Sequence, residues 1–364
     1  MVNHKESVTS YQAFAIISNA ILGASMLILP RTMAQVSGTP DGWITLLLMT
    51  AIYIMFIYVN VLMMKRTPFS SYFDYTKEGL GKWIGSVINV IIIIYFLGVA
   101  SYQVRAMSEL VKFFLLQNTP IAMTTLSFIL VGLYLVTGGI GDIARLFPFF
   151  LIVTLIILFI AFGISLQAFE LDHLRPVLGD GFTPVMKSFN TSSISFVGIE
   201  MLLFLPAFMN SQKHTFAYST FGFLISSVIY IFTYVLVIGA LTVKETATLT
   251  WPTIALFQSF DIHGIFIERI ESLLLIVWLV QLYTSFVIYT FFAAMGVSKL
   301  TKLPKIMVLA LLTIILYFAA ILPKDVNIAR DYLVYINYLF YLLFGILPFL
   351  LFAIVYLKRR RKAS

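Results

Sequence analysis

Two short stretches place a glycine and a polar residue inside apolar runs, and these are where the sequence could bind a ligand. The first begins at Gly23, continues through Ser25 and a Met-Leu pair, and ends in a proline. The second begins at Gly198 and repeats this order with Glu200 in the place of the serine. A glycine lets an apolar helix unwind, and the freed main-chain amides and carbonyls can bind a carboxylate and an ammonium group. The pair predicts two broken helices that bind a zwitterion, whereas a single glycine more often serves close helix packing.

Glu200 is the one of these residues that carries a charge. A carboxylate in an apolar segment is costly in hydrocarbon, so its side chain is expected to face the interior of a bundle. It could take up a proton in a coupling cycle, hold the broken main chain by hydrogen bonds, or contact the amine of a ligand. Its position within the glycine motif favours the holding role.

Catalytic and metal-binding patterns are missing from the sequence. It contains no cysteine, and its four histidines fall in predicted tails or loops without the spacing of metal ligands. It also lacks a nucleophile with a neighbouring base and a glycine-rich phosphate loop. We therefore expect no enzyme activity, no catalytic residue, no cofactor and no metal site.

The composition of the chain indicates which kind of secondary structure contains these residues. The chain has 364 residues, of which 60% are hydrophobic and 11% charged, against about 25% charged residues in an ordinary soluble domain. Such a chain needs a bilayer around it, and a bilayer admits helices that satisfy their own main-chain hydrogen bonds. The sequence thus predicts an all-α integral membrane protein.

Ten segments have about the 20 apolar residues that a membrane-crossing helix needs. They lie near Tyr11–Ala34, Trp43–Met64, Trp83–Leu116, Ile121–Val136, Arg145–Leu166, Ser188–Met209, Phe216–Val243, Ile265–Gly296, Ile306–Leu322 and Tyr332–Leu357. The short connections leave no room for a soluble domain. We expect residues 1–364 to form a single transmembrane domain, with helices one to five over about 11–166, helices six to ten over about 188–357, and a basic tail at 358–364.

The two glycine motifs fall in the first and sixth predicted spans. They are five positions apart in the order of helices, so the two halves of the chain would run in opposite directions, as in inverted-repeat transporters with paired broken helices. The net charge is +8, and about 15 basic residues fall on the side of the N-terminus, which predicts that both termini are cytoplasmic. We interpret the basic tail as a topology anchor at the lipid surface rather than as a partner-binding arm, and we expect no nucleic-acid binding.

Several motifs resemble those of known membrane proteins. The run Phe196-Val197-Gly198-Ile199-Glu200 resembles the F-x-G-x-E signature of the amino acid–polyamine–organocation superfamily, and Leu22 to Pro30 resembles its first-helix glycine motif, with Ser25 where a second glycine is usual. Four further motifs resemble those of the B subunits of GerA-type bacterial spore germinant receptors. They are Pro40-Asp41-Gly42-Trp43-Ile44, Gly79-Leu80-Gly81-Lys82-Trp83-Ile84-Gly85, Arg145-Leu146-Phe147-Pro148 and Leu174-Arg175-Pro176-Val177-Leu178.

This resemblance implies a LeuT-like fold of five plus five helices, with helices one and six broken. It also implies residence in the inner membrane of the endospore and assembly with a receptor A subunit and a lipoprotein C subunit. The ligand it implies is a nutrient germinant, usually a small amino acid.

The resemblance also carries site residues onto this chain. The amides of Gly23, Ala24 and Ser25 would face the ligand carboxylate, and the carbonyls of Phe196, Val197 and Gly198 would accept its ammonium group. On helix three, Tyr95 would offer its hydroxyl and ring, and Val99 would line the side-chain pocket.

Three more candidates come from helices eight and ten. Thr284 and Ser285 would complete the ligand site or a cation site against the first break, and Phe340 would act as a lid. Each has an ordinary structural alternative. Tyr95 and Phe340 could pack in the core, and the two hydroxyls could bond back to their own helical turn.

Two functions follow from this pattern. The first is a germinant-sensing subunit that binds a small amino acid and signals to partner subunits. The alternative is a proton- or sodium-coupled secondary amino acid transporter. Proton-coupled members of the superfamily carry a lysine in helix five, and the stretch from Leu146 to Leu166 has none. We therefore favour the receptor.

Overall fold

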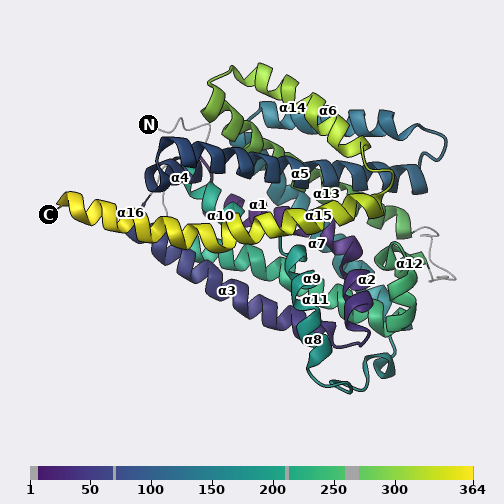
Figure 1. The fold of residues 1–364 in the computed structure, drawn as a ribbon. Coiled ribbons are helices and arrows are strands. Elements are labelled where there is room, and N and C mark those ends of the chain that lie inside the picture. Colours follow the sequence, from purple (N-terminus) through teal and green to yellow (C-terminus); the bar gives the residue numbers. More distant parts are fainter. Residues whose placement is uncertain (1–6, 69–70, 210–212, 259–269, 364) are drawn as a thin grey trace.

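The computed structural model describes residues 7–68, 71–209, 213–258 and 270–363. Every secondary-structure element of more than one residue in these ranges is a helix. The only pairing between extended segments there is a single bridge between Val8 and Met209. The predicted all-helical class is therefore confirmed (Figure 1).

The helices follow one another with short connections. In the first half they are α1 (Ser10–Leu22), α2 (Ser25–Ser37), α3 (Gly42–Arg66), α4 (Tyr72–Leu80), α5 (Lys82–Phe114), α6 (Ile121–Thr137) and α7 (Ile140–Ser165). In the second half they are α8 (Thr183–Lys187), α9 (Phe189–Ser195), α10 (Met201–Phe204), α11 (Thr215–Thr248), α12 (Pro252–Gln258), α13 (Ile270–Thr301), α14 (Lys305–Ile321), α15 (Val326–Phe340) and α16 (Leu347–Ala363). A π-helix, Tyr341–Ile346, joins α15 to α16.

Six helical stretches of the described chain are long and apolar enough to cross a membrane. A seventh is the pair α1 and α2, which bends by 46° at its break, and α6 and α14 are shorter apolar helices. The sixth predicted span is divided into α9 and α10. Ten spans in two inverted halves therefore stay a prediction. The predicted beginning of span eight, residues 265–269, lies outside the described residues.

Both helix breaks fall where the glycine motifs predict them. The first separates Leu22 from Ser25, with Gly23 between the two helices. The second is longer: α9 ends at Ser195 and α10 begins at Met201. Gly198 lies within this gap at φ 121°, a main-chain conformation that residues with a side chain rarely adopt. The glycines therefore sit where the helices are interrupted.

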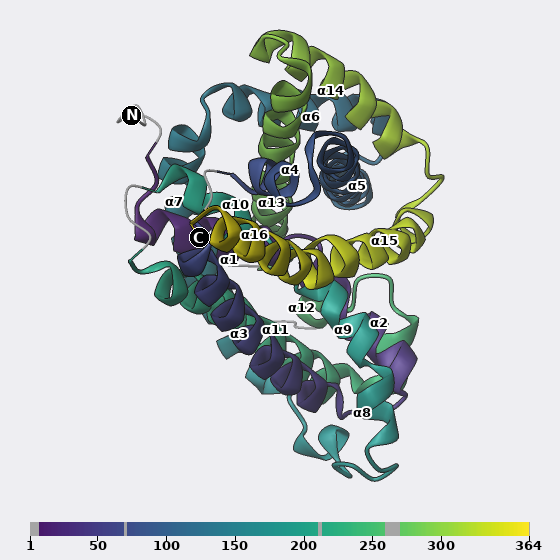
Figure 2. The same ribbon diagram turned by 60° about the vertical axis from the view of Figure 1, so that its left-hand side comes forward.

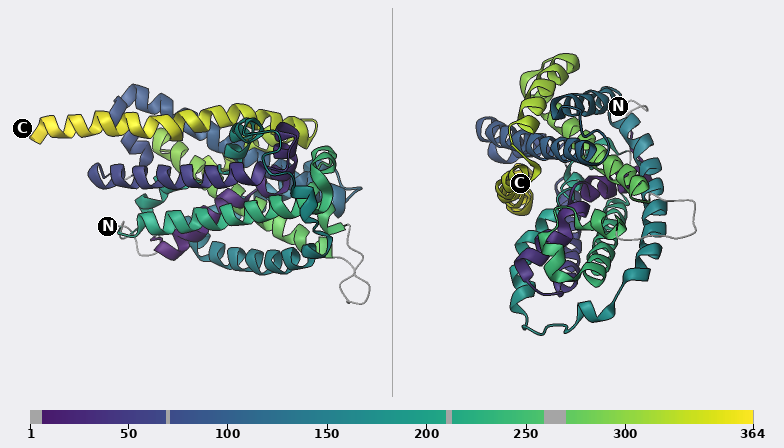
Figure 3. Two further views of the ribbon diagram at one scale, coloured as in Figure 1. Left: turned by 90° about the horizontal axis from the view of Figure 1, so that it is seen from below. Right: turned by 90° about the vertical axis from the view of Figure 1, so that its right-hand side faces the viewer.

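The arrangement of the helices places the two breaks in the middle of the bundle. The long helices α5 and α13 pack against each other, while α1 packs between α11, α7 and α13 (Figure 2). The start of α1 and the end of α16 lie at the same end of the bundle, and α16 extends beyond its neighbours there (Figure 3). That both termini are cytoplasmic stays a prediction.

Two elements carry more helix than the sequence indicated. The basic tail forms the end of α16, which continues as a helix to Ala363. The connection between the second and third predicted spans contains the nine-residue helix α4. Its apolar side is buried, with Tyr72 and Phe73 almost fully enclosed. The predicted loop is thus an ordered, docked helix.

Candidate ligand-binding site

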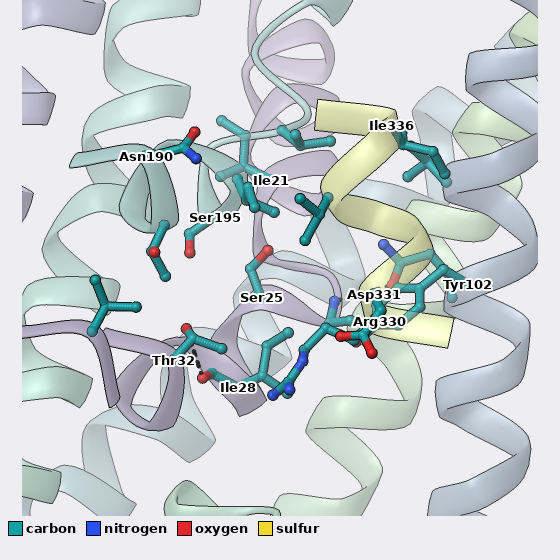
Figure 4. A pocket seen from close by; sticks show the side chains of 18 of the residues that line it. Ile21, Ser25, Ile28, Thr32, Tyr102, Asn190, Ser195, Arg330, Asp331 and Ile336 are labelled. Atoms are coloured by element: carbon teal, nitrogen blue, oxygen red, sulfur yellow. Dashed lines mark hydrogen bonds between the residues drawn. The ribbon is translucent and has the colours of Figure 1, made fainter. Parts of the chain in front are cut away.

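A cavity of about 240 Å³ lies between the two helix breaks, α5 and α15 (Figure 4). Its inner part is lined by the start of α2, by α5 and by the chain around the second break. Among the residues that line the cavity are Ala24, Ser25, Val99, Gln103, Ser195 and Val197. The cavity is smaller than the roughly 300–1,000 Å³ of pockets for drug-sized ligands, so its size suits a small molecule.

The two breaks touch each other through the main chain. A methyl group at Gly198 would lie 2.6 Å from the nitrogen of Ile21 and 2.8 Å from the carbonyl oxygen of Ala20. Distances this short leave no space for a side chain, and main-chain atoms cannot turn aside as a flexible side chain can. Gly198 is therefore required both for its own conformation and for the contact between the breaks.

Glu200 lies fully buried beside this contact, where three groups donate hydrogen bonds to its carboxylate. The hydroxyls of Tyr95 and Tyr289 donate to Oε1 over 2.6 and 2.7 Å, and the main-chain amide of Gly198 donates to Oε2 over 2.7 Å. The carboxylate thus ties α5 and α13 to the second break. This geometry is what a holding role requires; the role itself stays a prediction.

Gln103 on α5 is a residue that sequence reasoning missed. Its side-chain oxygen accepts a hydrogen bond from the amide of Ala24 over 3.0 Å, and its amide end lies close to Gly23. A spacing signal was present, because Tyr95, Val99 and Gln103 are each four residues apart and so share one face of a helix. The face of α5 that contacts the first break thus extends one helical turn further than predicted.

We predict that Gln103→Met weakens the response of this protein to its ligand. Methionine has a similar length and no acceptor for the Ala24 amide, and a buried donor left unpaired costs about 1–3 kcal/mol. The ligand concentration for a half-maximal response should rise about tenfold. Gln117→Met, at an exposed position in the next connection, is the matched control and should change nothing. Equal responses of the two variants would contradict this role.

Ser285 and Thr284 make different contacts. The Ser285 hydroxyl donates to the carbonyl oxygen of Ala20 over 2.8 Å, so it closes one side of the first break. The Thr284 hydroxyl donates to Gln281, one turn back on the same helix, over 3.0 Å. The Thr284 hydroxyl therefore bonds back to its own helical turn, as its structural alternative predicts. The Ser285 hydroxyl instead contacts the chain beside the first break.

The other aromatic candidates lie behind the cavity wall. Phe196 is buried, with its ring centre 5.3 Å from Tyr53 and 5.1 Å from Phe223. Phe340 is also buried, and its ring stacks on Tyr95 at 6.5 Å. Four of the predicted residues line the cavity, namely Ala24, Ser25, Val99 and Val197. The other predicted residues are not among those that line the cavity, and a lid role for Phe340 stays a prediction.

The outer part of the cavity adds polar residues that no motif indicated. Arg330 and Asp331 line it at the start of α15, and Asn190 lines it from α9 (Figure 4). Tyr102 also lines it from α5; the side chain is 4% exposed and its hydroxyl has no hydrogen-bond partner in the structure. A ligand in this space would meet charged groups of both signs and a free hydroxyl.

The chemistry available here is binding. The first amides of α2 have no acceptor within their own helix, and that of Ala24, just before α2, donates to Gln103. At the end of α9, the carbonyls of Ser193 and Ile194 accept from the amides of Phe196 and Val197, and a carbonyl oxygen with one such bond keeps a second lone pair. Both ends line the same cavity. Among the described residues, no group of three or more histidine, aspartate or glutamate side chains is placed to hold a metal ion.

Comparisons with known proteins agree on one family. A family model for spore germination proteins matches residues 7–329. Spore germination protein A2 of Bacillus subtilis strain 168 is 52% identical over 353 residues, which cover 97% of this chain and 96% of that protein. From the same strain, spore germination protein YndE is 36% identical over 99% of both chains, and spore germination protein B2 is 31% identical over 99% of this chain and 98% of its own length.

Proposed function

Because the chain belongs to the spore germination protein family, we propose that it is the germinant-sensing subunit of a spore nutrient receptor. It binds a small amino acid in the cavity between the two breaks and passes the resulting change to partner subunits. The family, together with several long apolar helices, makes it an integral membrane protein.

The observation that carries this proposal is the meeting of two opposite helix ends at one cavity. The start of α2 presents amides and the positive end of a helix dipole, which favour a carboxylate. The chain at the end of α9 presents carbonyls that keep a second lone pair beside their main-chain hydrogen bonds, and such oxygens favour an ammonium group. An α-amino acid carries both groups on one carbon, so it can satisfy both ends together. Val99 and Val197 line the same space and suit a small apolar side chain.

The wider assembly follows from the family. We propose ten membrane-spanning helices in a LeuT-like arrangement, in the inner membrane of the endospore, with both termini on the cytoplasmic side. The partners are a receptor A subunit and a lipoprotein C subunit. A bound ligand changes such a scaffold only by its differential affinity for two conformations, so the same cavity serves sensing without transport.

Coupled transport of amino acids is the second candidate, and the buried carboxylate of Glu200 is the observation that favours it. Against it, the Ser285 hydroxyl bonds directly to Ala20 where a cation would contact the first break. The receptor accounts for both observations, with Glu200 as a support for the second break.

The proposal is tested by a germinant screen on spores with and without this gene, using each amino acid singly. We expect the deletion to remove the response to one or a few small apolar amino acids. A deletion strain that still responds to every amino acid as the parent does would contradict the proposal.

We predict that Val99→Phe removes the response, because the larger ring fills the side-chain part of the cavity. The half-maximal concentration of the amino acid should rise by more than about tenfold, which corresponds to a loss of more than about 1.4 kcal/mol of binding free energy. Val87→Phe is the matched control, since Val87 lies on the same helix with a 59% exposed side chain. If both variants germinate normally, Val99 does not line the ligand site.

A further inference from the structure

The last membrane-spanning stretch, α15 to α16, connects the cavity with the far end of the bundle. Its first part, α15, lines the cavity with Arg330, Val334 and Ile336. Its last part, α16, extends beyond the other helices at the end where α4 lies (Figures 1 and 3). A change at the cavity can therefore reach α4 along one continuous helical segment.

The π-helix in the middle of this segment is held on two sides. On one side, the Tyr341 hydroxyl contacts the Ser193 hydroxyl and the side-chain oxygen of Asn190, both on α9 before the second break. On the other side, the Tyr72 hydroxyl of α4 donates to the carbonyl oxygen of Leu343 over 2.9 Å. π-helices occur mostly as short interruptions at functional sites. This interruption lies between the broken helix and α4.

The end of α16 docks on the end of α4 through charged side chains. Arg359 donates from Nε and Nη2 to the two carboxylate oxygens of Glu78 over 2.8 and 2.9 Å, and from Nη2 to the carbonyl of Pro68 over 3.0 Å. Lys358 donates to the carbonyls of Gly79 and Glu78 over 2.7 and 3.2 Å. A bidentate arginine fixes both position and direction, and a lysine stabilises the C-terminal carbonyls of a helix. We call these contacts the α4–α16 latch.

The other side of α4 is fixed to the helix that holds the first break. Asn89 of α5 donates to the carbonyl of Phe73 over 2.9 Å, and the Thr76 hydroxyl donates to the Asn89 oxygen over 2.6 Å. The same helix α5 carries Val99 and Gln103 at the cavity. α4 thus bridges α5 and α16, so the latch fixes how these two elements sit relative to each other.

We infer that the α4–α16 latch regulates the ligand-binding cavity by holding α15 and α5 in the arrangement in which the cavity is formed. This inference rests on the proposed sensing function. Any coupling between the latch and the cavity acts in both directions. Glu78 and Arg359 are 41% and 38% exposed, and half-exposed ion pairs are weak enough to open and close. The latch therefore provides an inner-end contact that ligand binding strengthens and that partner subunits can read.

The test measures germination of spores that carry Glu78→Gln, Arg359→Gln or the charge swap Glu78→Arg with Arg359→Glu. The probe is a mixture of amino acids, sugars and nucleosides, so that the result does not depend on which nutrient binds. Each single variant should need about threefold to fivefold more of the mixture for a half-maximal response, the effect of losing one partly exposed ion pair. The swap should return the response to within about twofold of the parent, because the pair is restored.

Arg360→Gln is the matched control, since Arg360 is the exposed next residue on α16, and it should leave the response unchanged. The amount of receptor in the membrane is measured in every strain. Single variants that respond like the parent, or a swap that is worse than both, would overturn the latch. The variants could behave as expected while no single amino acid acts through the parent receptor. That result would support the latch and reject an amino acid as the ligand.

Discussion

Replacing Gly198 by alanine should strongly weaken the response to germinant while the protein stays in the membrane. The alanine methyl would stand 2.6 Å from the nitrogen of Ile21 and 2.7 Å from the carbonyl carbon of Ala20. Residue 198 also has a φ of 121°, and such conformations cost non-glycine residues about 1–3 kcal/mol. Strain and overlap together should push the two breaks apart. The half-maximal germinant concentration should rise by more than about a hundredfold. This corresponds to about 2.8 kcal/mol, since each tenfold change is about 1.4 kcal/mol.

Gly163→Ala is the matched control for this variant. Gly163 lies in α7, and a methyl group there would meet nothing within 4 Å. We expect a normal response and a normal amount of protein. Germination of the Gly198→Ala strain at the parental concentration would show that the contact between the breaks is dispensable.

Replacing Glu200 by glutamine should have the second largest effect. A glutamine side chain offers one acceptor oxygen, whereas the Glu200 carboxylate accepts from Tyr95, Tyr289 and the Gly198 amide. Whichever way the amide is turned, either the Gly198 amide or the two hydroxyl hydrogens lose their acceptor. Each buried donor left unpaired costs about 1–3 kcal/mol. The response should weaken at least about tenfold, and the purified protein should unfold at a lower temperature.

Single substitutions of the two tyrosines should weaken the response by smaller amounts. Tyr95→Phe and Tyr289→Phe each remove one donor and leave the carboxylate with two others. Each should weaken the response less than Glu200→Gln does, and the double variant should approach it. A Glu200→Gln protein with parental stability and parental germinant response would contradict the holding role.

The sequence was informative where one residue type has few structural uses. Gly23 and Gly198 lie in apolar runs with the same order of residues around them, and this matched context predicted two interrupted helices; the structure interrupts both helices there. The buried position of Glu200 also followed from the cost of a carboxylate in hydrocarbon. Its partner Tyr289 did not, because a tyrosine in an apolar helix looks like any packing residue.

Contacts between segments far apart in the chain were beyond sequence reasoning. Gln103 meets Ala24 across 79 positions, and Arg359 meets Glu78 across 281. The basic tail reads as a topology anchor because the positive-inside rule explains it without a partner. Tyr341 and Leu343 of the π-helix likewise make hydrogen bonds to α9 and α4, and no local sequence pattern predicted the π-helix.

Whether the cavity between the two broken helices is that of a receptor can be measured with this chain alone in lipid vesicles. Radiolabelled amino acids identified by the germinant screen are added outside, and bound and accumulated label are measured separately. We predict saturable binding that Gly198→Ala removes, without accumulation above the outside concentration. Accumulation of label against its gradient, or the absence of saturable binding in the parent chain, would contradict the account.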